Sequence, residues 1–205
     1  MISSVQAILI NDEAIPEKEK EDFIVINNIL AQFVAYISIS DQALKTRLRD
    51  QFSFRNYETL RYMNNNDKAI IWAHTGHLEK EYSYVQLGAL LNYHLRSNYY
   101  NISFDYGSGE NGTRQPDIGL SAVRFNRLEG SLTDNLFKLG STDYFIDLRN
   151  TDYSNLQEKT YTIMNTLNEY TNVKTYHPYR ELTLAKSMDG LIFVRESSLP
   201  NRIKK

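Results

Sequence analysis

The chain has 205 residues, of which 41% are hydrophobic and 23% charged, a composition that is typical of a globular protein rather than a disordered one. The formal net charge is −2, so no overall basic field favours nucleic acid, and no nucleic-acid partner is expected. Cysteine is absent, which excludes disulfides, thiolate metal sites and a cysteine nucleophile. No apolar run reaches the length of a membrane span. The first residues also lack the pattern of a signal peptide, which favours a cytoplasmic location.

Two helices are predicted in the first third of the chain. Residues 15–38 carry apolar side chains three and four positions apart, after an acidic first turn that suits the helix dipole. Residues 40–67 show a second face of this kind, with Asp41 as the expected N-cap and a run of Asn at the end.

The rest of the chain alternates between strand and helix patterns. The expected elements are strands at 68–74, 99–106, 143–149 and 188–196, helices at 82–98, 132–140 and 156–171, and a Gly-rich loop at 107–119. This order predicts one α/β domain, or part of a larger one, with a largely parallel sheet covered by helices. The first strand is continuously apolar, as in strands that are buried on both faces.

Two of the four histidines lie in the sequence AHTGH, directly after the first predicted strand. Gly76 is expected to let the chain turn tightly there, so that His74 and His77 can enter one cleft and exchange protons near neutral pH. Two other interpretations stay open. One histidine caps the next helix while the other binds backbone, or both bind a metal with Glu79 or Glu81 as a further ligand.

A charged stretch, RDQFSFRN at residues 49–56, is the other unusual feature of the sequence. It places Arg49, Asp50, Arg55 and Asn56 on one predicted helix. Their side chains form either a solvated charged face or a set from which an arginine reaches a substrate carboxylate or an oxyanion. The chain has no Gly-x-Ser-x-Gly motif, so no serine nucleophile is visible, and the Gly-rich loop lacks the end of a phosphate-binding loop.

Taken in order, these pieces resemble the erythromycin esterase-like family. That family has a helix motif similar to Arg-Asp-x-x-Met-Ala-x-Asn, followed by a strand that ends in Trp-Ala-His-Asn-x-His. Here RDQFSFRN is followed by IIWAHTGH at the family's distance, and LGALLNYHL, YNISFDYGSG and DGLIF are similar to later family segments. The resemblance covers residues 40–199.

The resemblance implies a hydrolase that opens a macrolide lactone or cleaves another ester without a metal or cofactor. His74 and His77 would then bind the substrate and help to polarise or protonate the ester. Arg49, Arg55 and Lys80 are expected to contact the substrate. Asp50 and Asn56, on the same predicted helix as Arg49 and Arg55, would orient the helix and the histidine turn.

One departure from the family decides the prediction. The family's first half carries Gly-Glu-x-x-His-Gly, which supplies the expected general base, and this motif does not occur here. We therefore expect an incomplete esterase-like domain, the C-terminal half, that hydrolyses little by itself. Self-association or docking of an N-terminal companion half is expected. Two alternatives are a non-catalytic module that binds haem, a metal or a small molecule, and a purely structural partner half.

Overall fold

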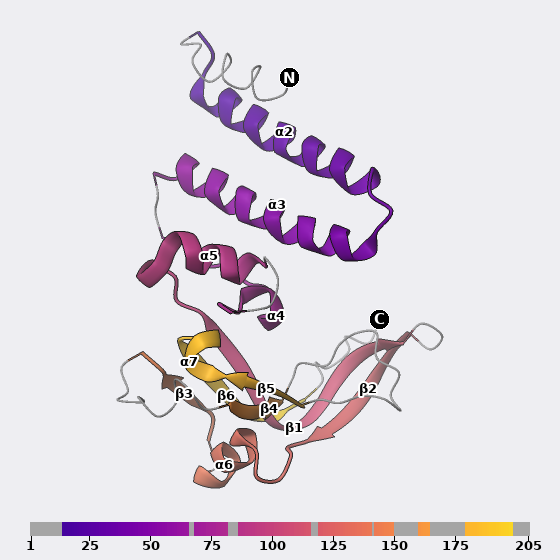
Figure 1. Ribbon diagram of the computed structural model, residues 1–205, viewed down its shortest axis with the longest axis vertical. Coiled ribbons are helices and arrows are strands. Elements are labelled where there is room, and N and C mark those ends of the chain that lie inside the picture. Colours follow the sequence, from indigo (N-terminus) through magenta and orange to yellow (C-terminus); the bar gives the residue numbers. More distant parts are fainter. Residues whose placement is uncertain are drawn as a thin grey trace, which may run out of the picture. The chain divides into compact units, whose positions relative to one another are not determined.

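The computed structural model describes residues 14–65, 68–81, 86–115, 119–140, 142–149, 160–164 and 179–198. The chain forms two compact units (Figure 1). Unit 1 comprises residues 1–78 and 82–94, and unit 2 comprises residues 79–81 and 95–205. Among the residues described, no helix has the length and apolar character that crossing a membrane requires.

The described part of unit 1 begins with two long helices, α2 (Glu17–Ile37) and α3 (Gln42–Met63), and both were predicted from the sequence. They run antiparallel (Figure 1), since Asn28 donates to Thr59 at 3.1 Å and Gln32 donates to Asn56 at 2.6 Å. The predicted cap is confirmed, because the Asp41 carboxylate accepts two backbone N–H groups at the start of α3.

Two shorter helices follow in the chain, α4 (Thr75–Leu78) and α5 (Leu87–Leu95). The helix α5 lies within the predicted helix 82–98, whose first four residues fall outside the described residues, and it ends in the 3₁₀ turn η1 (Arg96–Asn98). Within the residues of unit 1 that the structure describes, the buried apolar side chains come from α3, α4 and α5. They are Phe54, Leu78, Leu87 and Leu91.

The predicted strand at 68–74 is not formed. This segment is neither helix nor strand, and Ile70 and Trp72 are 96% and 84% exposed instead of buried. A strand requires a neighbour that satisfies its backbone N–H and C=O groups. No strand among the described residues pairs with this segment, so the apolar pattern alone does not make it a strand here.

Unit 2 is built on a four-stranded sheet in the order β2-β1-β6-β3. Its strands are β1 (Ile102–Gln115), β2 (Gly119–Asn126), β3 (Tyr144–Asp147) and β6 (Gly190–Ser197). The α/β class and three predicted strands are confirmed. The largely parallel sheet was wrong, because β1 and β6 are parallel but β1–β2 and β3–β6 are antiparallel. Alternating strand and helix patterns predict parallel strands that are joined by helices. Here β1 is followed directly by β2, and the two strands form an antiparallel hairpin.

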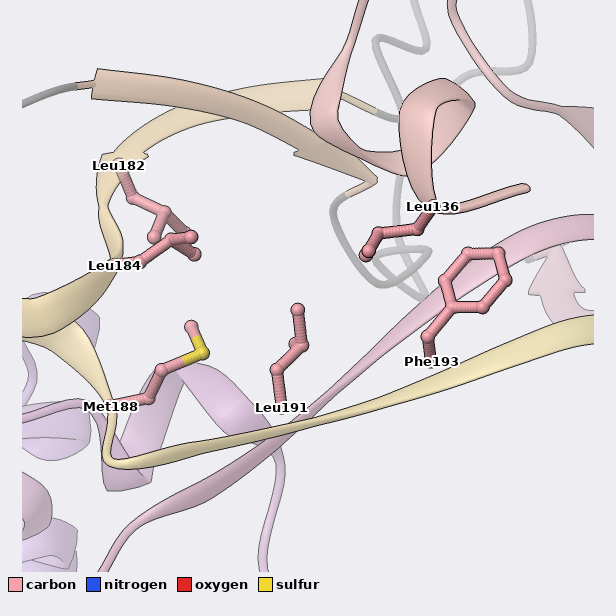
Figure 2. Packing of buried hydrophobic residues seen from close by; sticks show 6 residues of the cluster. All are labelled: Leu136, Leu182, Leu184, Met188, Leu191 and Phe193. Carbon is pink, nitrogen blue, oxygen red and sulfur yellow. The ribbon is translucent and has the colours of Figure 1, made fainter. Parts of the chain in front are cut away.

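The core of unit 2 lies on one face of this sheet. It is closed by α6 (Leu132–Leu139), by the two-stranded sheet of β4 (Thr160–Met164) and β5 (Tyr179–Thr183), and by the turn α7 (Leu184–Ser187). Figure 2 shows Leu191 and Phe193 of β6 facing Leu136 of α6 and Leu182 and Leu184. The helix α6 was predicted. The helix expected at 156–171 is wrong at 160–164, where β4 forms, and the rest lies outside the described residues.

The Gly-rich segment was expected to be a loop, yet residues 107–115 continue β1. Two of its glycines, Gly107 and Gly109, allow close packing. A Cβ at Gly107 would lie 2.6 Å from both the Arg195 carbonyl oxygen and the Phe137 ring, and one at Gly109 would lie 2.0 Å from the Ser197 carbonyl oxygen. Glycine therefore marks a close approach of two backbones rather than a turn.

Candidate active site

The best-defined polar group in unit 1 is the pair of Asp50 on α3 and His77 on α4. The Nδ1–H of His77 donates to Asp50 Oδ2 at 2.8 Å, and Asp50 is only 3% exposed. A buried carboxylate needs a charged or hydrogen-bonding partner, and the imidazole supplies it. This contact fixes the orientation of the His77 ring and places its hydrogen on Nδ1.

Arg49, the residue before Asp50, contacts the other nitrogen of the same ring. Its Nη2 lies 2.6 Å from His77 Nε2, and its Nε lies 3.8 Å from Asp50 Oδ1. A guanidinium can only donate, so Nε2 is the acceptor in this contact. The three side chains therefore hold His77 as the neutral Nδ1–H tautomer, with the Nε2 lone pair directed at a cation.

His74 adopts the opposite tautomer. The backbone N–H of Gly76 donates to His74 Nδ1 at 3.1 Å, so the ring hydrogen of the neutral form is on Nε2. The centroids of the His74 and His77 rings are 6.3 Å apart, and the rings lie edge to face. The exposed His74 can therefore donate a hydrogen bond beside a histidine that can accept one.

The turn between the histidines does not depend on glycine. His77 N–H donates to the His74 carbonyl oxygen at 2.9 Å, which closes one helical turn. Gly76 is not among the described residues with positive φ, and a Cβ there would meet His74 Nδ1 at an ordinary 3.4 Å. The tight turn that Gly76 was expected to provide is an ordinary helical one.

The other predicted site residues have different contacts. Asn56 exchanges hydrogen bonds with Gln32 of α2, so it joins the two long helices rather than the histidine turn. Arg55 is exposed on α3. Lys80 belongs to unit 2, where its ammonium contacts the carboxylate of Asp189. The structure thus brings together four of the seven predicted residues: Arg49, Asp50, His74 and His77.

The Asp189 carboxylate is the centre of a polar cluster in unit 2 that was not predicted. It is 4% exposed and accepts from Lys80, from Arg149 Nε at 2.7 Å and from the backbone N–H of Asn101 at 2.7 Å. Burial, followed by the charge of Asp189, raises the pKa of Tyr99. The cluster joins the starts of β1 and β6, which indicates a structural role. The feature of the sequence that could have indicated this cluster is Asp189, which stands directly before the apolar strand β6.

A metal site was one interpretation of the histidines. In the described parts of the chain, no group of three or more His, Asp or Glu side chains is arranged to hold a metal ion. Glu79, which was considered as a ligand, is buried and only 2% exposed.

The sequence profile of the erythromycin esterase family matches residues 6–197. The chain belongs to this family. Among curated proteins, none is detectably similar to it.

Solved structures share the fold. A protein from Bacillus cereus is 17% identical, with a TM-score of 0.78 over 100% of this chain and 52% of its own. A succinoglycan biosynthesis protein is 16% identical, with a TM-score of 0.74 over 96% of this chain and 48% of its own. A mutant of the erythromycin esterase EreC in its open conformation is also 16% identical, with a TM-score of 0.54 over 87% of this chain and 43% of its own. The chain spans about half the length of these structures.

Proposed function

We propose that this chain supplies the histidine part of a hydrolase site that opens a lactone or cleaves another ester. The observation that carries the proposal is the hydrogen bond of 2.8 Å between His77 Nδ1–H and the buried carboxylate of Asp50. A carboxylate in this position orients the ring and stabilises the imidazolium that forms when Nε2 takes up a proton. Family membership supports the reaction class.

Each residue of the group has a proposed step. Water attacks the ester carbonyl, and the general base that the family resemblance places in the other half takes its proton. The carbonyl oxygen becomes negative and accepts hydrogen bonds from His74 Nε2–H and the Arg49 guanidinium. After Arg49 has moved away, His77 Nε2 takes up a proton from solvent, and Asp50 compensates the charge of the resulting imidazolium. His77 donates this proton to the oxygen of the leaving alkoxide as the bond to the carbonyl carbon breaks, and the base later releases the proton of the attacking water to solvent.

This scheme requires Arg49 to move when the substrate binds. A protonated Nε2 cannot accept from a guanidinium, because both groups are then donors. The Arg49 side chain is 59% exposed, so it can rotate toward the ester oxygen without disturbing the core. The contact at 2.6 Å is thus the state before substrate binding.

The test uses the native gene product that contains this chain, isolated with an antibody against it, and a recombinant copy of the same product. Both are offered macrolide lactones and aryl esters, and mass spectrometry detects the gain of one water. Hydrolysis that is lost in His77→Asn but kept in His94→Asn supports the proposal. His94 is a matched control, since it is exposed on α5, where its ring lies 4.8 Å from the Phe54 ring. No hydrolysis, or hydrolysis that survives His77→Asn, contradicts it.

The purified 205-residue chain is expected to turn over these esters poorly by itself. Its sequence lacks the Gly-Glu-x-x-His-Gly motif, so it has no counterpart of the expected base. Clear turnover by the purified chain that His74→Ala abolishes would contradict this expectation. The haem-binding alternative stays a prediction, which an absorbance titration of the same sample with haem tests.

A further inference from the structure

The segment that joins α3 to the histidine turn carries the most exposed large apolar side chains of the described residues. Ile70 is 96% exposed and Trp72 is 84% exposed. Single exposed apolar residues are common, but two large ones on one short segment mark an interaction surface. The sequence around them, KAIIWAH, is rich in residues that favour strands.

Exposure over residues 70–74 has the period of a β-strand. Ile70, Trp72 and His74 are exposed, whereas Ile71 and Ala73, which alternate with them, are half-buried. Side chains of a strand point to opposite faces in turn, so Ile71 and Ala73 lie on a face that is already partly covered, whereas Ile70 and Trp72 lie on the exposed face. Ala69, at the start of the segment, is also exposed. The pattern fits a strand whose second face and backbone neighbour come from elsewhere.

A partner that binds residues 69–73 must bury the side chains of Ile70 and Trp72 as well as pair with the backbone. Edge-to-edge pairing with a second copy of the chain would satisfy N–H and C=O groups. It would leave Ile70 and Trp72 in water, because these side chains stand perpendicular to the sheet. A larger body is required, with a strand at its edge and apolar side chains above it.

The relatives indicate where such a body comes from. The Bacillus cereus structure aligns with all of this chain and still has nearly half of its own length left over. We propose that residues 69–73 form a β-strand in a sheet contributed by the half of the family fold that this chain does not span, with Ile70 and Trp72 buried in that half. The docked strand would end directly before His74, so docking would also fix the start of the histidine turn.

Trp72 is the only tryptophan of the chain and reports on this surface directly. We would label the purified 205-residue chain with 5-fluorotryptophan and follow its ¹⁹F signal and its sensitivity to solvent. The expected result is one solvent-exposed signal that does not change with protein concentration. A signal that becomes protected as the concentration rises would identify a second copy as the occupant and would overturn the proposal.

The second measurement is hydrogen exchange of the peptide that covers residues 69–73, in the purified chain and in the native gene product isolated with its bound partners. Exchange should be at least about 100-fold slower in the native product, since the amides then lie within a sheet. The recombinant double variant Ile70→Lys and Trp72→Lys should lose this protection, whereas Tyr62→Lys, at an exposed position on α3, should keep it. Equally fast exchange in the native product would overturn the proposal. Neither result depends on hydrolysis.

Discussion

The Asp50 carboxylate, which is 3% exposed, accepts the Nδ1–H of His77 at 2.8 Å, although 27 residues separate the two in the chain. Replacing this carboxylate by an amide keeps the size of the side chain and removes the charge that compensates a His77 imidazolium. Asp50→Asn in the native product should lower kcat for ester hydrolysis by about 10²- to 10⁴-fold, with a smaller effect on KM.

Steady-state kinetics measures this change, and ¹⁵N NMR of the histidine rings measures its cause. The wild-type spectrum should show hydrogen on Nδ1 of His77, and Asp50→Asn should populate the other tautomer. Asp22→Asn, at an exposed position on α2, is the control. An unchanged kcat in Asp50→Asn would show that the pair is structural only.

The contact of Arg49 with His77 leads to a second prediction about catalysis. Its guanidinium donates to His77 Nε2 at 2.6 Å, and on substrate binding it is proposed to donate to the ester oxygen. Arg49→Met should lower kcat/KM by about 10²-fold, as expected for the loss of one oxyanion donor. The free energy of unfolding should change little, because the side chain is 59% exposed. Arg61→Met, in the last turn of the same helix, should leave both quantities unchanged, and equal losses in the two variants would contradict the proposed role.

Much of the fold was predictable because local patterns determine it. The spacing of apolar residues predicts α2 and α3, and the carboxylate of Asp41 caps α3 as expected. The strands β1, β3 and β6 contain short runs of residues that pack well in sheets. The hairpin of β1 and β2 was missed because Gly107 and Gly109 predict a loop, whereas here they allow close contact with neighbouring residues. The β-branched residues of β4 favoured a strand and should have outweighed the helical interpretation.

The candidate site was predictable only in part. The two motifs identify Asp50 and His77, but only the structure shows that they bond to each other and that Arg49 contacts the same ring. Lys80 has a partner that its local sequence does not indicate. Its proximity to the histidines in sequence favours a site role, yet its partner Asp189 lies 109 residues further along the chain, a relationship that no local pattern contains.

Two glycines should differ in how strongly substitution by alanine changes the free energy of unfolding. Gly107→Ala places a methyl group 2.6 Å from the Phe137 ring and from a backbone oxygen, and such overpacking lowers the free energy of unfolding by about 1–3 kcal/mol. Gly76→Ala meets nothing closer than 3.4 Å and should change it by less than about 1 kcal/mol, since alanine favours a helical turn. Urea unfolding of the purified chain measures both. A larger loss for Gly76→Ala would contradict the described turn.

Lys80 is predicted to contribute to stability through Asp189. The two side chains are 12% and 5% exposed, and removing one partner of a buried pair costs about 3–5 kcal/mol. Asp189→Ala should approach this loss, because it leaves the Lys80 ammonium and the Asn101 N–H without their acceptor. Lys80→Met should cost less, since Arg149 still compensates Asp189.

Urea unfolding of these variants and of the double variant gives the coupling between the two residues. In the native product, the KM for an ester provides the contrasting measurement. A Lys80→Met variant of normal stability but raised KM would favour the substrate-binding role that the family resemblance implies over the structural one.

Acid should weaken unit 2 through Asp134 on α6. Hydrogen bonds from Lys138, from the backbone N–H of Gly130 and from Arg127 lower the pKa of this carboxyl from 3.8 to about 2. A carboxyl with a lowered folded-state pKa stabilises the fold above its unfolded-state value, and this contribution is lost as the pH falls from about 4 toward 2. The difference in free energy of unfolding between wild type and Asp134→Asn should therefore be constant above pH 5 and shrink below pH 4. Urea unfolding at each pH measures it, with Asp143→Asn as the control carboxyl. A difference that stays constant down to pH 2 would show that folding does not lower the pKa of Asp134.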